Sequence, residues 1–546
     1  MSLVNVNTLR TLNGDFSVNV ADILTKEFPF DDVTGYVNIR DDKYGAKGDG
    51  TTDDTASIQK ALNTGEPVFI PQGQYKVTDA LIAVNGQTIR GAGRLESVIT
   101  IGTDFNLSAS CVLRLGTEGS SVVGGEGGQL FDVGFDFEQA DQGVRDSCTK
   151  YPWAVSIKNL PRSRIDRVRI SSAWDGINAT GNCGGSFIGD IEIGALHTGL
   201  YVDGALDFIH GGHWHFWPFG MAGTSSLINV FYDTAGRALV LGACDGLNID
   251  TVATFSQAIE CTSTANVQGI PITINKLMLD SSQSCLLMSY GYIYVDSLYN
   301  TSNAVSYPCI SLSGNAKLVV GKFSGFTSRK HATLRTQDSA ILEVNGGYIY
   351  DVNTDYPLAI CYGASQINLS NMVFDHNGIT LTQPKVYQSD STATLRVNNC
   401  NWKNTGTGTA VQFSGGTDNS CLVNTFTGSY GVVVPVSSSS ARVAGVYKDI
   451  YSSSTGALYA NEIIGNVKRR RISSAATGSQ LAVPHGIPSL QLKALSVNAF
   501  YKDSSGVVYP CALVGIDGTN VNITTGASAA GNQVIVIINY VDSSIW

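Results

Sequence analysis

Residues 44–62 read YGAKGDGTTDDTASIQKAL, and residues 68–75 read VFIPQGQY. The end of the first stretch has an apolar stripe at helical spacing, formed by Ala56, Ile58, Ala61 and Leu62. Thr52 or Asp53 precedes this stripe and is suited to cap the first turn of a helix. The apolar run that opens the second stretch is typical of a buried strand ending at a turn. The two stretches therefore predict a short helix followed by the first strand of a β-structure.

The chain after residue 80 repeats at intervals of 20–28 residues. GINATG at 176–181 recurs 23 residues later as GLYVDG at 199–204, and IDRVRI at 165–170 recurs as IGDIEI at 188–193. Later apolar triplets begin at Leu318, Leu342, Ile367 and Leu395. Such a period with alternating apolar residues predicts a solenoid of β-coils, each of which needs its neighbours to bury its faces. A leucine-rich repeat has a similar period, but it needs helical segments that this sequence lacks.

The composition fits an all-β chain. Of 546 residues, 43% are apolar, 15% are charged and 59 are glycine, which suits short strands joined by tight turns. A formal net charge of -10 argues against nucleic-acid binding, which needs a basic surface. The eleven cysteines stand singly without metal-ligand spacing, so we expect buried, reduced thiols and neither metal nor cofactor. No signal-peptide pattern and no apolar run of membrane-spanning length occurs, so no membrane insertion is expected.

The pattern predicts five regions along the chain. An N-terminal segment (1–40) precedes a capping helix and first coil (41–80), and the β-helix with its substrate groove follows (81–447). The basic run Lys468 to Arg471 lies in a predicted linker (448–489). Alternating strands in 490–546 predict a small β-sandwich-like C-terminal domain.

Three motifs resemble known families. The string at 44–75 closely resembles the opening of the pectate-lyase-like β-helix family, in which the helix covers the open end of the first coil. The ordered set FDFEQ at 135–139, ALDFI at 205–209 and HFWPFG at 215–220 is similar to a set found in phage tailspike depolymerases. Pro-His-Gly at 484–486 resembles the opening of tailspike C-terminal domains, which help close the trimer or bind sugar.

The resemblance implies a right-handed parallel β-helix and a homotrimer. It also implies a virion component that attaches through its N-terminus to a phage tail or baseplate protein. Its partner at the host cell surface would be a bacterial surface polysaccharide, either capsule or O-antigen.

Carboxylates are the first candidates for catalysis. Cleaving a glycosidic bond needs an acid that protonates the leaving oxygen and a second carboxylate as base or nucleophile. Neighbouring coils lie about 4.8 Å apart, so carboxylates on nearby coils can form such a pair. The candidates are Glu138, Asp175, Asp207, Asp245 and Glu260. The preferred pair is Glu138, which alternation points outward, and Asp207, although a turn carboxylate often only bonds to its own loop.

A cluster of aromatic and basic residues supplies candidates for substrate binding. Aromatic faces pack against sugar rings, which makes Trp214 and Trp217 candidates, with core packing as the alternative. His213 and His215 alternate on a strand and share one face, while Trp214 points the other way. Arg167 and Arg169 are predicted to share a strand face and are candidates to hold an acidic sugar, with a solvated face as the alternative.

Three functions are compatible with these residues. The first is a glycoside hydrolase that uses a carboxylate pair. The second is a polysaccharide lyase acting by β-elimination on a uronic-acid polymer, with a histidine, lysine, tyrosine or arginine as base. The third is a receptor-binding spike without catalysis.

Overall fold

The computed structural model describes most of the chain. The described residues are 8–10, 17–19, 35–117, 126–139, 143–221, 225–262, 272–280, 285–301, 308–326, 331–350, 356–375, 383–403, 407–414, 419–422, 424–426, 429–433, 442–444, 450–452, 458–464, 467–475, 480–484, 494–502, 508–517, 520–524 and 533–541. Within them no helix is both long and apolar enough to cross a membrane. The chain forms two compact units, Met1–Phe231 and Tyr232–Trp546, which are described in turn.

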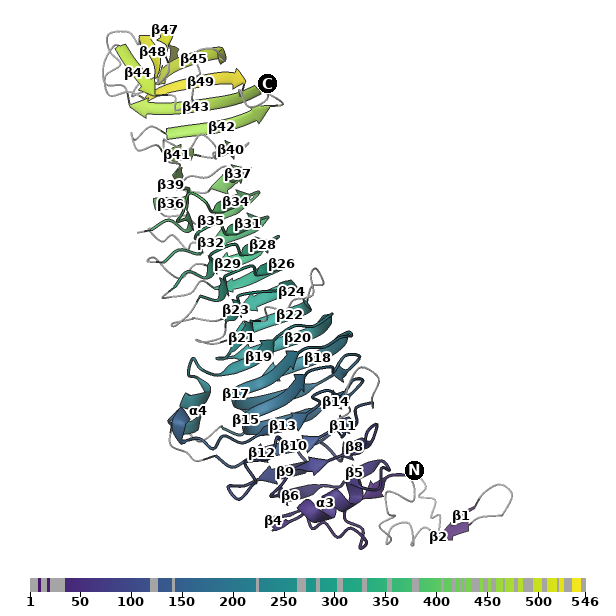
Figure 1. The fold of residues 1–546 in the computed structure, drawn as a ribbon. Helices are drawn as coiled ribbons and strands as arrows, with labels where there is room; N and C mark the ends of the chain where they lie inside the picture. Colours follow the sequence, from purple (N-terminus) through teal and green to yellow (C-terminus); the bar gives the residue numbers. More distant parts are fainter. Residues whose placement is uncertain are drawn as a thin grey trace, which may run out of the picture. The chain divides into compact units, whose positions relative to one another are not determined.

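The first unit is a stack of coils whose strands form three parallel ladders (Figure 1). Ladder A contains β3 (Val37–Asn38), β5 (Val68–Ile70), β8 (Thr88–Gly91), β11 (Gln129–Phe131), β14 (Arg164–Asp166), β16 (Phe187–Ile188) and the start of β18 (Ile209–Phe216). Ladder B contains β4 (Asp49–Asp53), β6 (Gly73–Val77), β9 (Ser97–Ile101), β12 (Gly134–Phe137), the first halves of β15 (Val168–Thr180) and β17 (Ile191–Asp203), and the end of β18. Ladder C contains β7 (Leu81–Ile82), β10 (Cys111–Arg114), β13 (Trp153–Ser156) and the second halves of β15 and β17. A parallel β-helix is thereby confirmed for this unit.

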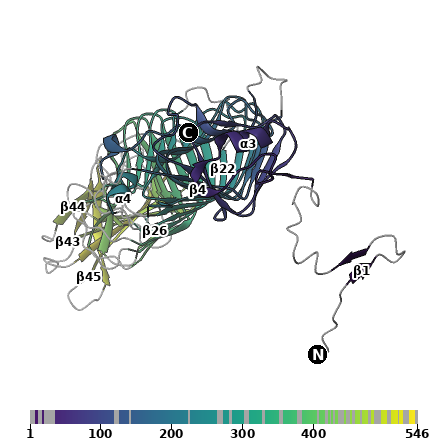
Figure 2. The ribbon, with the colours of Figure 1, turned by 90° about the horizontal axis from the view of Figure 1, so that it is seen from below.

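The predicted helix is present as α3 (Thr55–Leu62), which buries Ile58, Ala61 and Leu62. Its N-cap is Asp54, one residue beyond the predicted position. The Asp54 carboxylate accepts the backbone N–H groups of Lys47 and Gly48 at 2.7 and 2.9 Å, so it ties down the glycine-rich turn and does not cap the helix. Figure 1, and Figure 2 from below, show α3 near β4 at the end of this unit.

Side chains in register build the core of the first unit. Phe135 lies opposite Ile99 on one side and Ile170 on the other, and Ile193 and Phe216 continue the same row. All five are buried, and burying each such side chain contributes about 1.5–3 kcal/mol. The residues between them point outward, which is how the 23-residue repeat places polar side chains in columns. Two shorter elements are present: η1 (Arg145–Ser147) lies in the connection between ladders B and C, and α4 (Ser225–Phe231) follows the end of β18.

The second unit also begins with three parallel ladders. Ladder D contains β19 (Arg237–Leu241), β21 (Ala258–Cys261), β23 (Leu286–Met288), β25 (Ile310–Leu312), β27 (Leu334–Thr336), β30 (Ala359–Cys361), β33 (Val386–Gln388), β36 (Thr407–Gln412), β39 (Ser429–Val433) and β41 (Ile450–Ser452). Ladder E contains β20 (Leu247–Phe255), β22 (Ile272–Asp280), β24 (Tyr292–Asn300), β26 (Lys317–Phe326), β28 (Ile341–Val344), β31 (Gln366–Ser370), β34 (Thr394–Asn398), β37 (Ser420–Leu422) and β40 (Arg442–Ala444). Ladder F continues from the end of β26 through β29 (Gly347–Tyr350), β32 (Met372–Asp375), β35 (Asn401–Lys403) and β38 (Thr425–Phe426).

The last strands of the second unit pair antiparallel. One group contains β42 (Leu458–Ile464), β43 (Val467–Ala475), β45 (Ala494–Lys502), β46 (Val508–Pro510) and β49 (Gln533–Val541), and β42 also pairs with β41. A second group contains β44 (Gln480–Pro484), β47 (Ala512–Ile516) and β48 (Asn520–Thr524). The predicted linker 448–489 therefore holds strands of this antiparallel region. The basic run Lys468 to Arg471 lies in β43, because strand pairing uses backbone groups whatever the side-chain charge.

Two further expectations concern the termini and the thiols. At the N-terminus β1 (Thr8–Arg10) pairs antiparallel with β2 (Ser17–Asn19), while most of the predicted segment 1–40 lies outside the described residues.

All eleven cysteines are free thiols, and all except Cys511 are buried, as expected. Burial raises the pKa of Cys261 and Cys285 to about 12, which keeps these thiols protonated and unreactive.

Candidate functional site

The outward face of ladder B carries a column of functional side chains. Arg169 of β15 lies opposite Glu192 of β17, and Glu192 lies opposite His215 of β18. Their neighbours in each strand, Val168, Ile170, Ile191, Ile193, Trp214 and Phe216, are buried. Alternation therefore turns all three polar side chains outward, about 4.8 Å from one strand to the next.

Ion pairs organise the charges around this column. Arg94, from the turn before β9, donates through Nη2 to Glu192 Oε1 at 2.8 Å and through Nη1 to Asp190 Oδ2 at 3.0 Å. Arg169 Nη1 lies 3.8 Å from Glu192 Oε2. On the other side of Asp190, His213 Nδ1 lies 3.7 Å from Oδ1. The face thus presents two guanidinium groups and two carboxylates held in fixed relation to one another.

Asp136 adds a third carboxylate of a different kind. It lies in β12 between Thr100 of β9 and Ser171 of β15, and its side chain points outward. The side chain of Asp136 is exposed at the surface, and partial desolvation by its surroundings raises its pKa, while the positive charge of Arg169 opposes that rise. A carboxyl group with a raised pKa holds its proton to higher pH, which is the property required of a general acid.

Aromatic rings border the same column. The ring of His215 stacks on His213 at 5.8 Å between centroids, and it lies 5.9 Å from Trp217 and 5.3 Å from Phe219. The guanidinium carbon of Arg169 lies 4.9 Å from the Phe219 ring centroid. Burial of the imidazole and, after it, the neighbouring His213 lower the pKa of His215, which favours its neutral form near pH 7. Trp217 is 39% exposed, so a broad aromatic surface stands at the end of the column.

The structure corrects the prediction for Trp214. Its side chain is fully buried, with 0% exposed, and its indole Nε1 donates to the carbonyl oxygen of Ile188 at 2.8 Å. Because His213 and His215 point outward, the intervening Trp214 must point into the core. Trp214 therefore packs the core of the coil and has no surface to offer a sugar.

The structure does not bring together Glu138 and Asp207 within one chain. Glu138 is exposed and follows β12, where the chain passes from ladder B to ladder C, and its carbonyl accepts the Tyr151 hydroxyl at 2.7 Å. Asp207 follows β17, where the chain passes from ladder C to ladder A, and it accepts the backbone N–H of Phe208 at 2.7 Å. The two carboxylates lie at different edges of the coil, and Asp207 bonds to its own turn.

Asp175 has a partner that the sequence did not reveal. Its Oδ1 lies 2.7 Å from Nδ1 of His197, which stacks on Trp174 at 5.2 Å between centroids. The cationic groups of Arg145 and Lys150 lie 5.6 and 5.7 Å from the Trp174 ring centroid. His197 stands in no motif, and the 23-residue repeat places Thr198 opposite Asp175, so the period did not indicate it; a register irregularity lies between Ala173 and Asp175.

The remaining candidates are not members of the ladder B column. Asp245 is partly exposed in the turn before β20, and Glu260 of β21 accepts a hydrogen bond from Arg237; both belong to the second unit. Arg167 does not share a strand face with Arg169, because its φ of 53° takes it out of the extended conformation. Its side chain pairs with Asp132 at 2.5 Å and Asp166 at 2.7 Å.

Metal ligands are not grouped in the described part of the chain: no set of three or more histidine, cysteine, aspartate and glutamate side chains there could hold an ion.

Comparisons with known proteins give the following matches. A family model described as rhamnogalacturonase A/epimerase, pectate lyase-like, matches residues 36–125. The pre-neck appendage protein of Bacillus phage B103 is 31% identical over 151 residues, which is 26% of this chain and 16% of the phage protein. Alginate lyase 7 of Azotobacter vinelandii is 36% identical over 89 residues, which is 14% of this chain and 10% of the lyase. The crystal structure of tailspike protein gp49 from Pseudomonas phage LKA1 is 12% identical, covers 92% of this chain and 100% of that chain, and has a TM-score of 0.39.

These matches agree with the resemblance seen in the sequence. The family match covers α3 and the first coils, where the deciding stretch lies. The chain spans between 7% and 17% of the length of the curated relatives it matches. Over part of its length the chain is therefore similar to phage pre-neck appendage proteins, and its first coils match a pectate lyase-like family.

Proposed function

We propose that this chain is a phage tailspike that binds a bacterial surface polysaccharide and cleaves it by glycosidic hydrolysis on the ladder B face of the first unit. The observation that carries the proposal is Asp136, a carboxyl group of raised pKa, on the same outward face as Glu192 and the exposed ring of Trp217. Two carboxyl groups in unlike surroundings are what acid–base cleavage of a glycosidic bond requires.

Each residue of this face has a defined role in the proposal. Asp136 protonates the leaving glycosidic oxygen, and Glu192, held in place by Arg94 and Arg169, takes a proton from the water that attacks the sugar carbon as the glycosidic bond breaks. Trp217 packs against a sugar ring, while the two arginines bind sugar hydroxyl or acidic groups. The phage appendage protein that this chain resembles supports a virion tail location, and the relative named alginate lyase supports a polysaccharide target.

A second candidate is a polysaccharide lyase, and His215 favours it. The lowered pKa of His215 leaves a neutral imidazole that can accept a proton, and Arg94 and Arg169 can neutralise a uronate carboxylate. The relative named alginate lyase supports the same alternative.

Product analysis separates the two reactions. We expect the full-length protein to convert the surface polysaccharide of its host into saturated oligosaccharides, each carrying one added water by mass spectrometry. Elimination would instead release an unsaturated uronate that absorbs in the ultraviolet. Polymer that is bound but left intact would contradict both reactions and identify a spike without catalysis.

We also propose that the chain assembles as a homotrimer attached to a phage tail or baseplate protein through its N-terminus. Exposed apolar side chains on the coils, among them Leu206, Phe208 and Tyr299, favour burial between copies. Analytical ultracentrifugation should therefore give three times the mass of one chain, 57.9 kDa, at micromolar concentration. A stable monomer there would contradict this assembly.

A further inference from the structure

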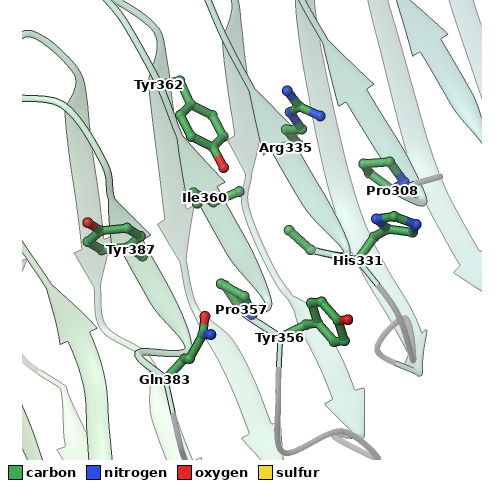
Figure 3. Close-up of a pocket in the computed structure, with 10 residues that line it drawn as sticks. Pro308, His331, Arg335, Tyr356, Pro357, Ile360, Tyr362, Gln383 and Tyr387 are labelled. Atoms are coloured by element: carbon green, nitrogen blue, oxygen red, sulfur yellow. The ribbon is translucent and has the colours of Figure 1, made fainter.

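Ladder D of the second unit holds a hollow of about 280 Å³ that none of the residues discussed above lines. Arg335 of β27, Ile360 of β30 and Tyr387 of β33 lie opposite one another on the outward side of three consecutive coils. Figure 3 shows these side chains with the rings of Tyr356 and Tyr362 around them. The volume of the hollow is near the lower end of the range for small-molecule sites, which is roughly 300–1,000 Å³. The hollow therefore suits a ligand the size of one sugar residue.

The hollow combines an apolar floor with aromatic walls. Ile360 and Pro357 lie in the middle of the group in Figure 3. Three tyrosines surround them, and Tyr356 is 41% exposed. Tyrosine offers a flat ring to the C–H face of a pyranose and a hydroxyl to its polar edge, which is the chemistry of a sugar site.

A positive charge stands at the edge of this hollow. The guanidinium carbon of Arg335 lies 5.3 Å from the Tyr362 ring centroid, and Nη2 donates to Gln337 at 3.0 Å. Its Nε is buried and has no hydrogen-bond partner among the described residues. A buried donor without a partner is costly, and a bound acceptor would remove that cost.

The surroundings of Arg335 favour an anionic acceptor. None of the ten described residues that line the hollow carries a carboxylate. A second basic side chain, Lys385, is buried, and its Nζ donates to the carbonyl oxygen of Tyr356, a residue that lines the hollow, at 3.4 Å. A guanidinium group without a competing carboxylate binds carboxylate through charge-assisted hydrogen bonds.

We propose that this hollow binds one acidic sugar residue, through its carboxylate on Arg335 and its ring against the tyrosines. It would hold a polysaccharide chain without cleaving it. The site does not depend on the proposed cleavage at ladder B, because a spike without catalysis would use it equally.

The test uses ligand-observed saturation-transfer NMR on the full-length protein, with sodium D-glucuronate as probe and D-glucose as its neutral match. We expect saturation transfer to glucuronate and little to glucose. Arg335→Ala should weaken glucuronate binding by about tenfold or more, the loss expected for a charge-assisted hydrogen bond. Arg335→Lys should restore it only in part, because an ammonium lacks the planar pair of donors.

Two further variants keep the test decisive. Tyr356→Ala removes an exposed ring that lines the hollow, and it should weaken binding of both glucuronate and its oligomers. This variant keeps the site testable if Arg335→Ala does not fold. Arg396→Ala, on ladder E of the same unit, removes an equal charge and should leave binding unchanged. The proposal is overturned if glucuronate binds Arg335→Ala and Tyr356→Ala as well as it binds the unmodified protein. Loss of binding only in Asp136 or Arg169 variants would place the acidic sugar at ladder B instead.

Discussion

Replacing Asp136 with asparagine is expected to slow polysaccharide degradation by at least about 10²-fold, the lower range of general acid–base contributions. The amide has nearly the shape of the carboxylic acid but cannot deliver its proton to the leaving oxygen. Binding of the polymer should persist, because Trp217 and the arginines remain. The measurement is the rate of oligosaccharide release, with binding to intact polymer measured in parallel.

The pH dependence has a defined sign. Desolvation raises the pKa of Asp136, so the group is protonated below that pKa and loses its proton above it. An acid catalyst works in the protonated form, and the rate should therefore fall as the pH rises through the pKa of Asp136. The asparagine variant should lack this alkaline limb in its residual activity.

A stability control distinguishes catalysis from folding. The folded protein disfavours the ionised form of Asp136, so this carboxyl contributes less stability once the pH exceeds its folded pKa. Asp136→Asn should consequently unfold at the same temperature as the unmodified protein near pH 7, or at a higher one. Asp296→Asn, an exposed strand position in the second unit, is the matched control and should leave the rate unchanged. Normal turnover by Asp136→Asn would remove it as the acid and direct attention to Asp175 beside His197.

The two tryptophans of the HWHFW sequence should give opposite results. Trp214→Ala removes a fully buried indole and leaves the Ile188 carbonyl without its donor, so a loss of about 3–5 kcal/mol in unfolding free energy is expected. Trp217→Ala removes a ring that is 39% exposed, and its stability cost should be about 1 kcal/mol or less. Trp217→Ala should instead weaken oligosaccharide binding by about tenfold, within the range of a well-packed aromatic contact.

Unfolding half-lives at a fixed temperature are the measurement for this pair, because long coil stacks unfold slowly and often irreversibly. Trp214→Phe is the control that keeps most of the buried volume, and it should recover part of the lost stability. If Trp217→Ala shortens the half-life as much as Trp214→Ala does, then Trp217 packs in the core and its assignment to the sugar-binding surface is wrong.

The fold could be predicted from sequence because its signals are local or periodic. The helix at Thr55–Leu62 follows from one apolar stripe, and the coils follow from repeats such as 165–170 and 188–193. Its N-cap, Asp54, could not be predicted in the same way, because the Asp54 carboxylate bonds to the backbone of Lys47 and Gly48 and not to the helix.

The candidate site was only partly predictable, because its chemistry depends on neighbours far along the chain. Alternation correctly placed His213 and His215 on one face and Trp214 on the other. It could not indicate that Arg94, 98 residues before Glu192, supplies the ion pair of that face. Nor could it indicate that the outward Asp136 lies in surroundings that raise the pKa of its carboxyl group.

The arrangement of candidate carboxylates shows the same limit. Glu138 and Asp207 both stand at strand ends, which sequence can recognise, but they lie at different edges of the coil. The edge of the coil at which each carboxylate lies depends on how many residues the connections contain. The loop between β12 and β13 is much longer than most. A period of 23 residues predicts columns within one ladder, and it does not predict which edges face one another.

The most direct test of the proposed site is an experimental structure of the Asp136→Asn protein with a bound oligosaccharide of the host polysaccharide. The proposal predicts a sugar chain on the outward face of ladder B, with one ring against Trp217 and a glycosidic oxygen within hydrogen-bond distance of residue 136. An oligosaccharide bound beside Asp175 and His197, with the ladder B face left empty, would contradict it.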